Sequence, residues 1–234
     1  MAAPALPPET PARQARAVLR ATDRAALATS QEGWPFASLV LVALDHDATP
    51  LLLISDLSEH AKNIKREPRV SLLFDGTHGL DDPLTGPRVT VLGEARVSAD
   101  THLRQRFLAR HPAAELYAGF ADFHLYRIAV ARAHLVAGFG RIHWIETPDL
   151  LPDVDPAWAA REHEITAALN GDAARLRTVL HAHGLDDGWR LTGLDPEGAD
   201  LRHRGVISRL EFATVARGPD DGLRAIAQAK LTKR

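Results

Sequence analysis

Two strand-length apolar runs in close succession are the feature that most restricts how this chain can fold. Phe36–Leu44 is apolar at nearly every position and partly β-branched, which is typical of a strand buried on both faces. Leu51–Ser55 repeats the pattern after the short polar segment Asp45–Pro50. Because a short polar loop between two apolar runs indicates a hairpin, we expect these two segments to pair.

More strands follow, with few helices between them. Val70–Phe74 is apolar, Val89–Val97 alternates between apolar and polar residues, and Phe123–Ala137 has a long period of two that suits one strand or two meeting at a bend. Helical patterns are short, as in Pro11–Ala21 and Ser58–Arg66. Many strands in about 145 residues predict a mainly β domain, a small antiparallel barrel.

A second domain is expected after the segment Thr147–Pro156, which is rich in proline and aspartate. Beyond it the pattern predicts two helices, two or three strands and a last helix, which together form a small α+β domain. The predicted organisation is therefore an N-terminal leader and helix over residues 1–22, a barrel over 23–148 and the α+β domain over 155–234.

Composition removes several classes of function. The chain has no cysteine, so thiolate metal sites and cysteine nucleophiles are excluded and any redox role must come from a bound cofactor. Its 28 basic and 30 acidic residues give a formal charge of −2, which predicts neither a nucleic-acid partner nor a membrane partner. No apolar run is long enough for a transmembrane helix, and the N-terminus lacks the pattern of a signal peptide, so a cytoplasmic protein is expected.

The most informative segment for function joins the end of a strand to the start of a helix. Ser55 ends an apolar strand, and Ser58 precedes a helical pattern that contains His60 and Asn63. The first N–H groups of a helix and its positive dipole end favour an anion, and these four side chains add hydrogen-bond donors, so the segment could bind a phosphate. The alternative is an ordinary N-capped helix with a solvated polar face.

The same segment resembles a known family. The pattern Ser-x-Leu-Ser-x-His-x-x-Asn-Ile over residues 55–64, followed by Pro68–Leu72, is similar to the flavin-phosphate segment of the pyridoxamine-phosphate-oxidase-like split barrels. Other segments resemble the haem-utilisation branch of that family and the α+β domain fused to it: Asp82–Gly93, Asp122–Arg127, Ala133–Gly140 and Gly193–Leu201.

This resemblance implies a six-stranded antiparallel split barrel that forms a homodimer, with FMN-sized sites across the dimer interface. The phosphate would lie near Ser55, Ser58, His60 and Asn63, the isoalloxazine ring would lie beside the backbone of Ser38, Leu39 and Val40, and Arg88 would supply a cation. Related oxidases carry an Arg-Lys pair where this chain has Glu59 and His60, so a true pyridoxamine-phosphate oxidase is not expected.

Three functional hypotheses follow. The first is an FMN-binding oxidoreductase that acts on a small molecule, with no catalytic residue assigned. The second is a haem-binding or haem-degrading protein in which a histidine ligates the iron, and His143, beside Trp144, is the candidate at the haem face. The third is a non-catalytic sensor or assembly module. No other metal site is predicted.

Overall fold

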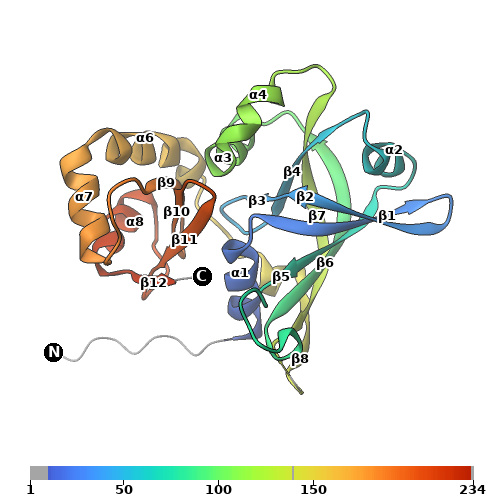
Figure 1. Cartoon of the computed structure of the whole chain (residues 1–234), viewed down its shortest axis with the longest axis horizontal. Coiled ribbons are helices and arrows are strands. Elements are labelled where there is room, and N and C mark those ends of the chain that lie inside the picture. Colours follow the sequence, from blue (N-terminus) through green and yellow to red (C-terminus); the bar gives the residue numbers. More distant parts are fainter. Residues whose placement is uncertain (1–9, 139, 233–234) are drawn as a thin grey trace. The chain divides into compact units, whose positions relative to one another are not determined.

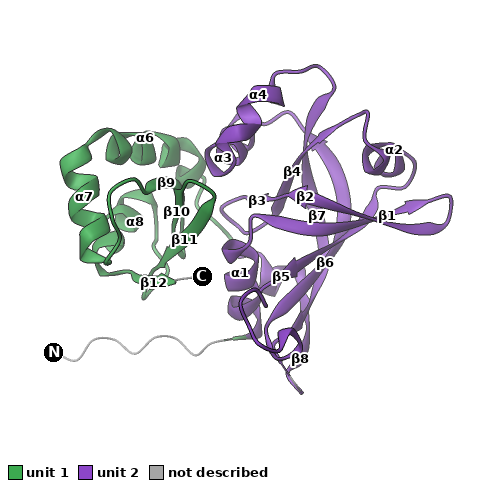
Figure 2. Ribbon diagram, viewed as in Figure 1, with its two compact units in different colours: residues 1–10, 153–234 green, residues 11–152 purple. Residues whose placement is uncertain are grey.

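The computed structural model describes residues 10–138 and 140–232 of the chain (Figure 1). The expected leader, residues 1–9, and Phe139, within a segment that carries the family resemblance, lie outside the described residues. The chain divides into two compact units, one of residues 11–152 and the other of residues 1–10 and 153–234 (Figure 2).

The first unit contains a curled antiparallel sheet, compatible with a split barrel, which has eight strands in the described part of the chain. In spatial order they are β2 (Trp34–Leu41), β1 (Arg24–Gln31), β5 (Arg69–Asp75), β6 (Arg88–Ser98), β7 (Phe123–Val136), β4 (Pro50–Ser55) and β3 (Ala43–Leu44), with β8 (Ile142–Glu146) paired to β7. Its helices are α1 (Pro11–Ala21), α2 (Glu59–Arg66), α3 (Thr101–Arg110), α4 (Glu115–Ala118) and α5 (Thr147–Leu150), with 3-10 turns at Pro83–Thr85 and Pro112–Ala114.

The hairpin predicted from the two apolar runs is confirmed, but its first run forms two strands. Ala43 of β3 pairs with Leu51 of β4. Before that, β2 ends at Leu41, and the backbone N–H of Val42 instead donates to the carbonyl of Asp23, which precedes β1. This break, together with the separate strand β8, is why the expected count of six strands is not confirmed.

Strand β4 is buried on both faces, as its continuous apolar pattern predicts. Leu51 and Leu52 are each fully buried although neighbours in a strand point to opposite sides. Leu52 belongs to the main core, whereas Leu51 packs with Phe107 of α3 in a smaller cluster. Helix α3 therefore covers the face of β4 that the barrel interior does not.

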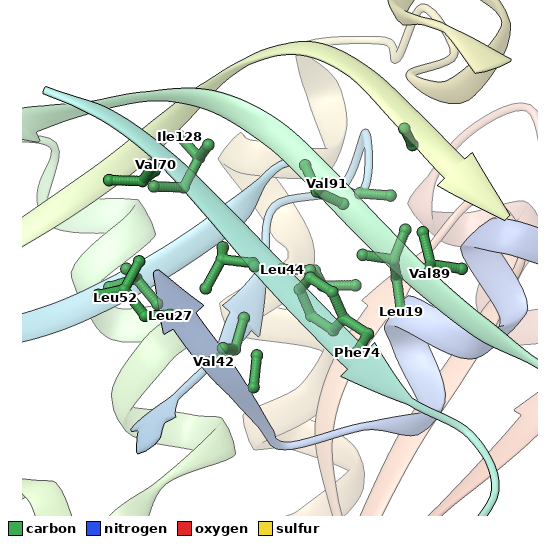
Figure 3. Close-up of a cluster of buried hydrophobic side chains, with 14 of the residues drawn as sticks. Leu19, Leu27, Val42, Leu44, Leu52, Val70, Phe74, Val89, Val91 and Ile128 are labelled. Atoms are coloured by element: carbon green, nitrogen blue, oxygen red, sulfur yellow. The ribbon is translucent and has the colours of Figure 1, made fainter. Parts of the chain in front are cut away.

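The main core lies inside the curl of the sheet, where side chains from β1, β4, β5, β6 and β7 meet (Figure 3). Phe74, Leu72 and Val91 are almost completely buried there. Leu19 of α1 belongs to the same cluster, so the helix of the expected N-terminal segment is part of the barrel core. Full burial of each such side chain contributes about 1.5–3 kcal/mol.

A bulge in the pairing of β6 with β7 controls which side chains of β7 face outward. The register shifts between Leu92 and Gly93, so that Ala131 has no direct partner. A Cβ atom at Gly93 would lie 2.5 Å from the carbonyl oxygen of Ala129, which leaves room for glycine alone. Because of the extra residue, Ile128 and Ala133 both point into the core although they are five positions apart.

The second unit is a small α+β arrangement with a four-stranded sheet in the described residues, one strand more than the sequence suggested. Its strands are β9 (Arg190–Asp195), β10 (Gly198–His203), β11 (Val206–Glu211) and β12 (Lys230–Thr232), and its helices are α6 (Ala157–Gly171), α7 (Ala173–Ala182) and α8 (Pro219–Ala225), with a 3-10 turn at Ile226–Gln228. No helix among the described residues is long and apolar enough to cross a membrane.

Candidate functional site

The start of α2 brings together the serine side chains that the sequence singles out. Ser58 is the N-cap: its Oγ accepts a hydrogen bond from the N–H of Ala61 at 3.3 Å and donates to the carbonyl of Ser55 at 2.8 Å. The hydroxyl of Ser55 donates to Asp122 Oδ2 at 2.5 Å and accepts from the N–H of Leu57. Both hydroxyls therefore already have partners in the turn and in the adjoining strand.

Acidic side chains surround this helix start. Besides Asp122, Asp56 forms an ion pair with Lys65 at 2.8 Å, and Glu59 forms one with Lys62 at 2.6 Å. Hydrogen bonds from these lysines lower the pKa of both Asp56 and Glu59, so the two carboxylates stay ionised at neutral pH. A phosphate here would lie beside three carboxylates, and the two nearby lysines are already engaged by Asp56 and Glu59, which opposes the attraction of the helix dipole.

His60 and Asn63 lie in different environments on α2. His60 is half-buried, and burial lowers the pKa of its imidazole, which favours the neutral ring. Asn63 is fully buried, and its Nδ2 donates to Thr29 Oγ1 at 3.0 Å. The amide of Asn63 thus faces the interior beside β1 and not the start of the helix.

The three residues predicted beside a flavin ring do not share one face of β2. Ser38 and Val40 pair with inward-facing residues of β1 and point into the barrel, whereas the side chain of Leu39 is 74% exposed on the other side. Arg88 begins β6 opposite the end of β5, about 20 Å along the strand from α2. Its guanidinium donates to the carbonyls of Leu84 and Gly86. Within one chain, Arg88 does not meet the α2 residues.

The outward side of the sheet, here called the outer face, carries an apolar surface. The site predicted from the sequence did not include this surface, apart from Leu39. Its members follow from the pairing registers of neighbouring strands. They are Leu39 and Leu41 of β2, Ala26 and Ala28 of β1, Ser71 and Leu73 of β5, Thr90 and Leu92 of β6, Arg132 and His134 of β7, and Ile142 and Trp144 of β8. A hollow of about 380 Å³ lies on this side, bordered by Ala28, Ser71, Leu92, Arg69 and Trp34.

An aromatic and basic cluster adjoins the hollow. The guanidinium of Arg132 lies 4.2 Å above the ring of Trp144, and the ring of His134 lies 4.6 Å from that of Trp144. No described residue forms a hydrogen bond with the imidazole of His134. Arg132 pairs directly with Leu92, so the cluster continues the wall of the hollow.

The histidine that the sequence singled out lies on the opposite side of the sheet. His143 pairs with the buried Leu135, whereas Trp144 pairs with His134. Successive residues of β8 point to opposite faces, and His143 and Trp144 are therefore separated by the sheet. His134 shares the face of Trp144, and the register of β7 against β8 is the signal that identifies it.

Comparisons with known proteins agree with this fold. Residues 6–151 match the family model described as "CREG, beta-barrel". The chain is 33% identical over 137 residues to the non-canonical heme oxygenase HOZ, chloroplastic, of Arabidopsis thaliana, a match that covers 55% of this chain and 41% of that protein. This chain therefore spans about two fifths of that relative's length.

Two solved structures are similar over nearly the whole chain. One is the protein Atu2129, of unknown function, from Agrobacterium tumefaciens, with a TM-score of 0.77, 28% identity and coverage of 96% of this chain and 100% of that one. The other is a heme binding protein from Mycobacterium smegmatis, with a TM-score of 0.59, 28% identity and coverage of 95% and 98%.

Proposed function

The chain belongs to the CREG β-barrel family, and we propose that it binds haem. The observation that carries the proposal is the 28% identity, over nearly the full length of both chains, to the heme binding protein from Mycobacterium smegmatis. Haem, the second of the three hypotheses from the sequence, is therefore favoured over FMN. The three carboxylates around the start of α2 also disfavour a flavin phosphate at that position.

The outer face has the chemistry that haem requires. A porphyrin needs an apolar wall, and Leu39, Leu73 and Leu92 with the small residues between them form one. Its propionates need cations, and Arg69 lines the hollow while Arg132 pairs with Leu92 in its wall. Haem, when bound, supplies an iron centre whose reactivity is set by its axial ligand and by the polarity around it.

We assign the iron ligand to His134. Its imidazole shares the outer face with the apolar wall, and no described residue forms a hydrogen bond with either ring nitrogen. The ring contact with Trp144 limits its rotation without engaging those nitrogens. His143 lies on the other side of the sheet, and His60 lies on α2.

A second copy of the chain would complete the site. One face of a sheet covers only one side of a ligand, whereas binding sites enclose most of it. Leu39, Leu73 and Trp144 are 74%, 42% and 54% exposed, and large exposed apolar surfaces mark interaction sites. An isologous dimer through the outer face would bury them and provide the opposite wall.

A haem titration tests the ligand assignment. We expect a saturable shift of the Soret band at a defined stoichiometry, loss of that shift in His134→Ala, and retention in the matched variant His143→Ala. His60→Ala distinguishes a ligand on α2 from one on the outer face. An unsaturable shift would overturn haem binding, and an unchanged His134→Ala titration would overturn the assignment.

The oligomeric state in solution tests whether a second copy of the chain provides the opposite wall of the site. Sedimentation should show a dimer that Leu73→Glu dissociates, because a carboxylate at the centre of the outer face would be buried unpaired. Leu116→Glu is the control, since Leu116 is 82% exposed on α4, away from the outer face. A monomeric wild-type protein, or a Leu73→Glu variant that remains dimeric, would contradict the proposed interface.

Haem breakdown is the second candidate function, favoured by the 33% identity to the Arabidopsis heme oxygenase. With a reductant and oxygen, the Soret band should decay with formation of a linear tetrapyrrole. Catalase is the necessary control, because free hydrogen peroxide destroys haem without an enzyme. A decay that catalase abolishes would leave haem binding without turnover.

A further inference from the structure

A second hollow, of about 280 Å³, opens on the opposite side of the sheet from the outer face, between α2 and one end of β6 and β7. Ala95 and Tyr126 in its wall point toward the barrel interior, whereas Leu92 and Arg132 point outward. Its lining residues are Asp56, Ile64, Lys65, Ala95, Val97, His124 and Tyr126. We call it the Tyr126 pocket.

The hydroxyl of Tyr126 is the unusual group in this pocket. The residue is only 2% exposed, but its oxygen keeps contact with solvent, and none of the described residues forms a hydrogen bond with that hydroxyl. The hydroxyl is therefore open to the pocket as a hydrogen-bond donor. Burial raises the pKa of Tyr126, and the charge of Asp56 raises it further, so the group keeps its proton and acts as a donor.

Asp56, the acidic residue of the pocket, already has two partners. Asp56 forms an ion pair with Lys65 through Oδ1 at 2.8 Å, and its Oδ2 lies 3.2 Å from Nε2 of His124. Lys65 has three N–H donors, of which Asp56 accepts one. The donors that remain at the pocket are therefore the hydroxyl of Tyr126 and the ammonium of Lys65.

We propose that the Tyr126 pocket binds a small monocarboxylate. Its carboxylate would accept hydrogen bonds from Tyr126 and Lys65, and its apolar body would lie against Ile64, Ala95 and Val97. The volume lies just below the range of about 300–1,000 Å³ typical of drug-sized ligands, so the occupant is small.

Other ligand charges fit less well. A cation would compete with Lys65 and His124 for the one carboxylate, Asp56. A phosphate dianion would bring two charges next to Asp56, whereas a monocarboxylate brings one. A neutral ligand would use the hydroxyl of Tyr126 but not the charge of Lys65.

Benzoate is a suitable probe, and nuclear magnetic resonance of the full chain can locate its site. We expect saturable shifts of amides around Tyr126 with a dissociation constant of about 1 mM or lower. Tyr126→Phe keeps the ring and removes only the donor, and it should weaken binding about five- to tenfold. Lys65→Met should weaken binding at least as much, whereas Lys62→Met, on the same helix and outside the pocket, should have no effect.

Benzamide separates the role of charge from that of shape, because it is neutral and nearly isosteric, and it should bind more weakly than benzoate. The haem titration of Tyr126→Phe should match the wild type, because the pocket and the outer face lie on opposite sides of the sheet. Absence of saturable shifts at about 10 mM benzoate, or equal affinity in Tyr126→Phe and wild type, would overturn the proposal.

Discussion

The hydroxyl of Ser55 donates a 2.5 Å hydrogen bond to the carboxylate of Asp122, the residue immediately before β7. This bond joins the end of β4 to the neighbouring strand and places a negative charge at the turn before α2. A serine expected to donate to a phosphate thus donates to a carboxylate of the protein itself.

Weak flavin binding follows from this arrangement. We expect FMN to bind the wild-type protein with a dissociation constant above about 100 μM, measured by quenching of flavin fluorescence. Asp122→Asn should bind FMN more tightly, since the amide oxygen can still accept from Ser55 while the charge is removed. Loss of one charge at about 4 Å corresponds to about 1–4 kcal/mol, or at least fivefold. Purification of a yellow wild-type protein with bound FMN would contradict this expectation.

The pair formed by Asn63 and Thr29 should contribute to stability and not to ligand binding. In Thr29→Val the Nδ2 of the fully buried Asn63 loses its acceptor, which should lower the free energy of unfolding by about 1–3 kcal/mol in urea. The double variant Thr29→Val, Asn63→Leu should recover part of this loss, because neither side then leaves a polar group unpaired. Equal stability of Thr29→Val and wild type would show that the hydrogen bond contributes nothing.

Local patterns in the sequence predict much of the barrel. The apolar runs around Asp45–Pro50 predict the β3–β4 hairpin, and β4 is buried on both faces as expected. The same expectation is wrong for the first run, because Leu39 and Leu41 of β2 are 74% and 42% exposed on one side of the sheet. Glu32 and Gly33 form the tight turn between β1 and β2 with φ values of 54° and 87°, and the glycine suits this conformation because it adopts positive φ values without strain.

The candidate site is less predictable, because it depends on pairing between distant strands. Alternation along β8 alone separates His143 from Trp144, but the position of His134 beside Trp144 is set by the register of β7 against β8. Likewise, the position of Arg88 follows from the antiparallel pairing of β5 with β6, which places it far from α2. Such registers are properties of the whole sheet and not of any one segment.

Three buried charged residues in the second unit, Arg209, Asp195 and Asp200, also form contacts that the sequence does not predict. We call them the buried triad. A turn at Asp195–Gly198 is evident from the sequence, but the ion pairs across the sheet are not. Arg209, 4% exposed, lies 2.8 Å from carboxylate oxygens of both Asp195 and Asp200. It belongs to β11, and the two acids belong to β9 and β10.

Removal of the cation from this triad should destabilise the second unit. Arg209→Met leaves two buried carboxylates without their cation, at a cost of about 3–5 kcal/mol in the free energy of unfolding. Tryptophan fluorescence in urea can follow the change, because Trp158 is buried in this unit whereas Trp34 and Trp144 are exposed. Arg224→Met is the matched control, since Arg224 is 72% exposed and should change stability by less than about 1 kcal/mol. Equal effects of the two substitutions would contradict a special role for the triad.

The connection between α2 and β5 should respond to acid at an unusually low pH. Arg69 holds Glu67 with two side-chain hydrogen bonds, at 2.8 and 2.6 Å, and these lower the pKa of Glu67 from 4.5 to about 2. Since the folded-state pKa is the lower one, the stabilisation is complete above about pH 4.5 and is lost as the pH falls toward 2. A carbon-13 titration of the glutamate carboxyls should show this low midpoint.

Arg69→Met should return the pKa of Glu67 close to its ordinary value of 4.5, because both hydrogen bonds and the neighbouring charge are removed. Arg96→Met removes a comparable exposed arginine, paired with Glu94 on β6, and should leave the midpoint of Glu67 unchanged. A wild-type midpoint near 4.5 would show that the pair does not persist in solution, and Arg69 would then be available to a ligand on the outer face without first leaving Glu67.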